Sequence, residues 1–142
     1  MKKKEFLNAV EYEVRTLKKI GTTKELEKLD LYSLNPNITA KCIYGQMTGD
    51  CASYRAKELM DEACIIVTNN VHGVCFFSGN TFRDIKKSLN GKNEGQGWYG
   101  RMSLKRNYSH LSALEAYIYL KDAKKKNIIE FLKGNTNKLK LS

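Results

Sequence analysis

The sequence has few of the features that mark membrane, secreted or disordered proteins. It contains a single proline, and its longest apolar runs, such as CIIV at 64–67, are far too short to span a bilayer. Acidic residues interrupt the apolar positions behind the N-terminal lysines, which is not the pattern of a signal peptide. We therefore expect a cytoplasmic protein without a membrane segment, whose four cysteines stay reduced.

Acidic residues are scarce as well. The 142 residues include 25 lysines and arginines against 15 aspartates and glutamates, which gives a formal net charge of +10. A charge of this sign attracts polyanions such as nucleic acid, or an acidic protein. Lysine-rich surfaces also serve solubility alone, so it is the clustering of the charge that points to a ligand.

Hydrophobic spacing predicts several helices before residue 64. Apolar residues recur with helical periodicity near the N-terminus, and Thr22 with Glu25 forms a capping box for a short second helix. A short helix that ends at Gly45 is expected next. Asp50 is a good N-cap for a helix over 51–63.

The middle of the chain predicts strands. Two runs rich in β-branched and aromatic residues, 64–68 and 71–77, are joined by Asn69 and Asn70, which predicts a tight hairpin. From Trp98 the chain alternates between a mostly apolar face and a basic, aromatic face. This period of two predicts a half-buried third strand.

Further helices follow, one behind the capping box of Ser112 and Glu115 and one that ends before Gly134. No repeat or linker divides the chain. The sequence therefore predicts a single α+β domain over 1–134, with about three antiparallel strands packed with five or six helices. A loose C-terminal tail is expected over 135–142.

The strongest functional signal lies in residues 91–108, where four glycines lie before and within the start of the basic, aromatic strand. Lysine neutralises phosphate as a point charge, arginine binds it through two hydrogen bonds, and aromatic rings stack on bases. We expect a phosphate-bearing ligand to contact Arg101, Lys105 and Arg106 through its phosphates, Tyr99 and Trp98 by stacking, and Lys86, Lys87 and Lys92 as a flank.

The predicted function is binding rather than catalysis. We expect a small basic protein that binds nucleic acid or a nucleotide, and the composition also suits an accessory or inhibitor protein of a phage or mobile element. Lysine runs at 2–4, 18–19 and 124–126 fit solvated helix faces one by one, and together they would extend a phosphate-tracking surface. The alternative is an interaction protein that docks an acidic partner, which requires Tyr12, Tyr117 and Tyr119 to be exposed.

A cysteine nucleophile is a further interpretation. Cys51 follows the candidate cap Asp50, where a helix dipole favours a thiolate, and Gln46 lies upstream as an oxyanion donor, with His72 or His110 as the base. This short segment resembles the Gln-then-Cys arrangement of papain-like peptidases, but the spacing differs and the aromatic after the cysteine and the downstream Asn-Trp are missing. A cysteine packed in a stripe of small residues has the same pattern, and we prefer that interpretation.

No other constellation predicts metal, cofactor or acid-base chemistry. His72 and Cys75 have the spacing of one zinc-ligand pair, but no second close pair accompanies them, so we expect no metal site and no cofactor. Acidic pairs such as Glu11 and Glu13 lie among lysines on expected helices, and we interpret them as surface charges.

Overall fold

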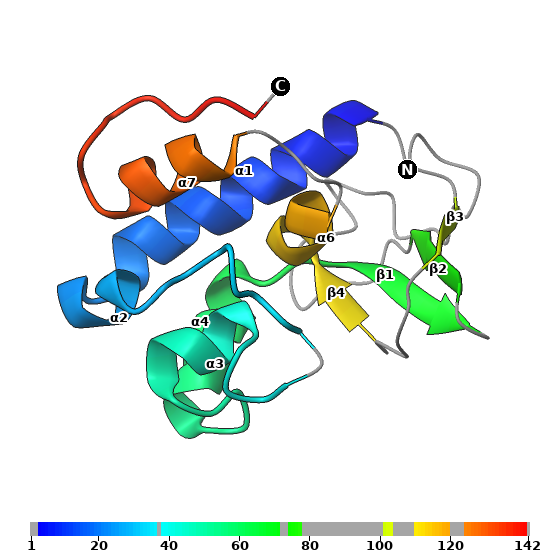
Figure 1. Cartoon of the computed structure of the whole chain (residues 1–142), viewed down its shortest axis with the longest axis horizontal. Coiled ribbons are helices and arrows are strands. Elements are labelled where there is room, and N and C mark those ends of the chain that lie inside the picture. The colour runs from blue at the N-terminus through cyan, green and yellow to red at the C-terminus, as the bar shows by residue number, and fades with distance from the viewer. Residues whose placement is uncertain are drawn as a thin grey trace.

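The computed structural model describes residues 3–36, 38–71, 74–77, 101–103, 110–119 and 124–141. Figure 1 shows a body of helices with a small sheet at one end. In chain order the elements are α1 (Lys3–Ile20), α2 (Thr23–Glu27), α3 (Ile43–Thr48), α4 (Tyr54–Ala63), β1 (Ile66–Val71), β2 (Val74–Phe77), β3 (Arg101–Ser103), β4 (His110–Ser112), α6 (Ala113–Tyr119) and α7 (Lys125–Leu132).

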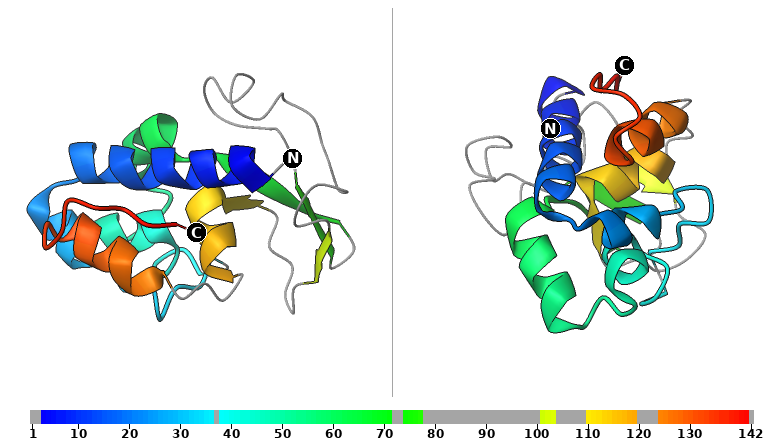
Figure 2. Two further views of the ribbon diagram at one scale, coloured as in Figure 1. Left: turned by 90° about the horizontal axis from the view of Figure 1, so that it is seen from above. Right: turned by 90° about the vertical axis from the view of Figure 1, so that its left-hand side faces the viewer.

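Helix α1 is the central helix of the helical body. Its side chains at Phe6, Val10, Val14 and Leu17 are all fully buried, as the helical spacing of apolar residues in the sequence predicts. Helices α4, α6 and α7 all pack against α1. Figure 2 shows α4 and α7 on different sides of α1.

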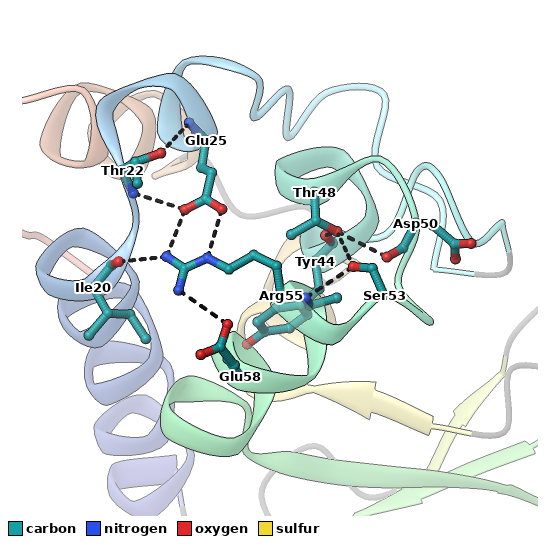
Figure 3. A network of polar contacts seen from close by, with 10 residues as sticks. Ile20, Thr22, Glu25, Tyr44, Thr48, Asp50, Ser53, Arg55 and Glu58 are labelled. Carbon is teal, nitrogen blue, oxygen red and sulfur yellow. Dashed lines mark hydrogen bonds and ion pairs between the residues drawn. The ribbon is translucent and has the colours of Figure 1, made fainter.

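The corner between α1 and α2 is fixed by the capping box, which the sequence correctly predicts. The Thr22 hydroxyl accepts the Glu25 N–H at 3.1 Å, and the Glu25 carboxylate accepts the Thr22 N–H at 2.9 Å. Arg55 of α4 then binds the same carboxylate with two nitrogens, at 2.8 and 2.9 Å, and donates to the Ile20 carbonyl at 2.9 Å (Figure 3). These hydrogen bonds hold the pKa of Glu25 at about 2 and join α4 to this corner.

The expected cap of α4 is wrong by three residues. Ser53, not Asp50, is the N-cap, because the Ser53 hydroxyl accepts the Ala56 N–H at 3.1 Å. The Asp50 carboxylate instead accepts the N–H of Ala52 at 2.9 Å and closes a local turn before the helix. Both residue types are good caps, and only the path of the chain before the helix decides between them.

The expected end of α3 at Gly45 is also wrong, since the helix continues to Thr48 and ends at Gly49, where φ is 95°. Gly45 is buried inside the helix for a different reason. A Cβ atom at this position would lie 1.9 Å from the Thr39 carbonyl oxygen, so no larger residue fits.

The four strands form one sheet in the order β3-β2-β1-β4, and β1 pairs antiparallel with both β2 and β4. The expected hairpin is present, but its turn is misplaced. Asn69 and Asn70 are paired within β1, opposite Phe76 and Cys75, so they belong to the strand and do not form the turn. The β propensity of the surrounding residues outweighs the turn preference of asparagine here.

The prediction of an α+β domain with about three antiparallel strands packed with five or six helices is wrong for the part of the chain that the structure describes. These residues are mostly helical, and three of the four strands are only three or four residues long. Among the helices, α6 lies against β1 and β4. Alternation in a sequence indicates a strand but does not say what packs on it.

The C-terminal segment is not the loose tail that the sequence predicts. Asn127 in the first turn of α7 donates to the Lys138 carbonyl at 3.0 Å and accepts the Lys140 N–H at 2.6 Å. Leu141 is buried, and its carbonyl accepts a hydrogen bond from the hydroxyl of Tyr117, which is itself 1% exposed. The tail therefore runs back alongside α7 (Figure 1).

Replacing Leu141 with alanine should lower the free energy of unfolding by about 2 kcal/mol, because the side chain would leave a cavity in the core. Lys140→Ala is the matched control, since that side chain is exposed. Urea denaturation of both variants measures the difference. Equal stability of both variants and the unmodified chain would mean that the tail is loose after all.

Candidate functional site

The residues expected to bind a ligand fall almost entirely outside the described part of the chain. Arg101 begins β3, where it pairs with Phe76 of β2. The other expected site residues lie outside the described residues, namely Lys86, Lys87, Lys92, Trp98, Tyr99, Lys105 and Arg106. Binding of a phosphate-bearing ligand by this set stays a prediction.

The structure contradicts two of the features expected for a cysteine hydrolase at Cys51, while the side chains of His72 and His110 lie outside the described residues. Cys51 lies in a turn before Ser53, the residue that caps α4, so it is not at the helix N-terminus as expected. The Gln46 amide is not available as an oxyanion donor, because its nitrogen donates to the carbonyls of Asp30 and Lys41, each at 3.1 Å. Its oxygen accepts the Asp30 N–H at 2.7 Å. Gln46 therefore links α3 to the segment that follows α2.

Cys42 also has a structural role. Its sulfur accepts the Gly45 N–H at 3.3 Å and caps α3, and burial raises the pKa of its thiol to about 12. His72 and the side chain of Cys75 lie outside the described residues. In the described part of the chain, no three histidine, cysteine or acidic side chains gather as a metal site would need.

The sequence interpretation missed the burial of two carboxylates. Glu13, expected on the surface, is completely buried in α1, and Glu115 of α6 is nearly so. The Glu13 carboxyl hydrogen-bonds the Tyr44 hydroxyl at 2.6 Å and accepts the Leu114 N–H at 2.8 Å. The helical spacing from Val10 and to Leu17 places Glu13 on the apolar stripe of α1, so periodicity alone would have revealed its burial.

Glu115 completes this buried cluster. Its carboxylate accepts the Ser112 N–H at 3.1 Å in the predicted capping box, and the Ile43 N–H at the start of α3 at 3.3 Å. All four carboxylate oxygens of Glu13 and Glu115 thus have partners from the protein. Such fully satisfied acids hold helices together rather than act on a substrate.

The cluster makes stability depend on pH. Burial raises the pKa of Glu13 from its ordinary 4.5 to about 8, and the hydrogen bonds from Tyr44 and Leu114 oppose that shift. Between these two values the folded chain holds a proton that the unfolded chain releases. The contribution of Glu13 to stability is therefore full below about pH 4.5 and is lost as the pH rises through about 8.

Glu13→Gln should remove this dependence, because glutamine keeps the shape of the protonated acid and does not titrate. The unmodified chain should lose stability between about pH 4.5 and 8, and the variant should not. The free energy of unfolding of the variant, minus that of the unmodified chain, should therefore rise by up to about 1.4 kcal/mol per pH unit over this range. Urea denaturation at several pH values checks this. A difference that is constant with pH would contradict the titration of Glu13.

Basic side chains gather on α7 and the docked tail. Residues 124–141 contain one acidic residue, Glu130, whose carboxylate accepts a hydrogen bond from the Asn135 side chain at 2.9 Å. The bonds of Asn127 bring the tail back to the start of α7. We call the resulting patch the lysine surface; its members are Lys124, Lys125, Lys126, Lys133, Lys138 and Lys140.

Two shallow grooves lie on the described residues. One, of about 300 Å³, separates α2 from the end of α7 and is lined by Lys18, Lys133 and Glu27 among others. The other, of about 360 Å³, follows the exposed face of α1 around Tyr12 and Arg15. Both are open to solvent and carry charges of both signs, so neither encloses a small ligand as a typical cofactor site does.

The chain matches no family model, no curated protein and no solved structure. No described helix combines the length and the apolar character needed to cross a membrane. A function is therefore inferred from the arrangement of side chains.

Proposed function

We propose that the protein binds nucleic acid, and that the lysine surface on α7 and the docked tail contacts its phosphates. The observation that carries this proposal is the hydrogen bonding of Asn127 to the backbone of Lys138 and Lys140, because it brings the tail that carries these two lysines beside the first turn of α7, where the run 124–126 lies. A protein that presents several lysines to a polyanion releases the condensed counterions, which drives binding at low salt.

The open surface supports a polymer over a free nucleotide. A small ligand is ordinarily held in a pocket that buries most of its area, and the two grooves of the described residues are shallow. A polymer instead gains affinity from many weak contacts spread over a surface. Six lysines over 124–140 offer such contacts.

Docking of an acidic protein is less well supported. That alternative requires three tyrosines to be exposed, and Tyr117 is 1% exposed with its hydroxyl bound to the Leu141 carbonyl. Tyr12 is 49% exposed, but its hydroxyl donates to the Glu62 carbonyl at 3.0 Å. The side chain of Tyr119 lies outside the described residues.

Charge reversal on the lysine surface should weaken binding and flatten its dependence on salt. For the double variant Lys126→Glu and Lys138→Glu, the slope of log affinity against log salt should fall by about 2, with roughly tenfold weaker binding at low salt. Titration of a fluorescent oligonucleotide at several salt concentrations measures both quantities. Both lysines are exposed, so the fold should be unaffected.

The matched control is Lys19→Glu with Lys57→Glu. It changes the net charge by the same amount at exposed positions on α1 and α4. Equal loss of affinity in both double variants would mean that net charge alone attracts the polymer and that the lysine surface is not its site. An absence of oligonucleotide binding by the unmodified chain at low salt would refute the proposed function.

A further inference from the structure

From the surroundings of one exposed ring we infer that Tyr32 is a stacking platform for an unpaired base, so that the ligand of the lysine surface is single-stranded. This inference rests on the proposed function. Tyr32 is 68% exposed, and the Lys125 Nζ lies 5.8 Å from the centre of its ring. An aromatic face thus adjoins the lysine surface, which pairs a site for a base with sites for phosphate.

The turn at residues 30–33 holds Tyr32 in place. The Asp30 carboxylate accepts the Tyr32 N–H at 3.1 Å and the Ser33 hydroxyl at 2.8 Å. Leu31, between Asp30 and Tyr32, is 1% exposed and anchors the turn in the core. The backbone therefore directs the Leu31 side chain inward and the Tyr32 side chain into solvent. Because the turn is already ordered, a ligand that stacks on the Tyr32 ring loses little further conformational entropy in the protein.

Gln46 joins this turn to the helical body. Its side-chain amide hydrogen-bonds both the N–H and the carbonyl of Asp30, as a neighbouring backbone strand would. Because Gln46 lies on α3, the position of the turn follows from the packing of that helix.

Lysines of α7 flank the turn at two places. Lys125 contacts the Tyr32 ring, and the charge of Lys133 acts on the Asp30 carboxylate, whose pKa is lowered chiefly by its hydrogen bond with Ser33 and to a smaller extent by Lys133. These lysines lie eight positions apart, or about 12 Å along the helix.

Single-stranded nucleic acid fits this arrangement better than a duplex. Stacking on a protein ring needs a base whose face is free, and base pairs inside a duplex cover one another. Tyr54 is even more exposed, at 92%, but it begins α4, which packs on a different side of α1 from α7 (Figure 2). Tyr54 is therefore the matched control for an exposed tyrosine away from the lysine surface.

The experiment compares Tyr32→Ala, Tyr32→Phe and Tyr54→Ala for binding to a single-stranded oligothymidylate of about twelve nucleotides. Tyr32→Ala should weaken this binding about 5- to 150-fold, the equivalent of 1–3 kcal/mol per stacked base. Tyr32→Phe keeps the ring and should retain the affinity, and Tyr54→Ala should bind as the unmodified chain does. Inorganic polyphosphate, which has no bases, should bind the Tyr32→Ala variant and the unmodified chain equally.

Undiminished binding of oligothymidylate by Tyr32→Ala would overturn the inference, and so would tighter binding of a duplex than of the single strand. Either result leaves the proposed function standing as long as the unmodified chain binds nucleic acid in a salt-dependent way. Equal losses for oligothymidylate and polyphosphate in Tyr32→Ala would also overturn the stacking role. Thermal unfolding of each variant checks that the fold is retained.

Discussion

The described structure depends on the hydrogen bonds of two buried acids, Glu13 and Glu115. Each places a carboxyl oxygen in the core, where it accepts an N–H group at the start of another helix. The first four N–H groups of a helix have no partners within that helix, and burying them unpaired is costly. Glu13 of α1 accepts the Leu114 N–H of α6, and Glu115 accepts the Ile43 N–H of α3. These hydrogen bonds fix the positions of three helices that are distant in sequence. Burial raises the pKa of both acids.

The surface that we propose as the binding site follows from this packing. Helix α3, fixed through Ile43, carries Gln46, which holds the turn of residues 30–33. Helix α7 lies against α1, where the Lys18 Nζ donates to the Phe131 carbonyl at 2.7 Å, and Asn127 returns the tail to it. The lysine surface and the Tyr32 ring thus come together through contacts between segments that are far apart in the chain.

Local signals predicted the elements whose contacts are local. Both capping boxes and the amphipathic helix α1 depend on residues within a few positions of each other, and the structure confirms them. Predictions that depend on the path of the chain outside an element were wrong. Ser53, not Asp50, is the N-cap of α4. The polar tail, expected to be loose, is bound to α7 through Asn127. The arrangement of strands among helices was also wrong, because alternation leaves the packing partner of a strand undefined.

The same distinction applies to the site. The excess of lysines is visible in the sequence, but the adjacency of Tyr32 to Lys125 is not, since 93 positions separate them. The most direct test of the account is to follow backbone amide chemical shifts by NMR while adding a single-stranded oligonucleotide. The largest shifts are expected at residues 30–33, 124–126 and 138–140. Shifts confined to residues 86–106, or to the exposed faces of α1 and α4, would contradict it.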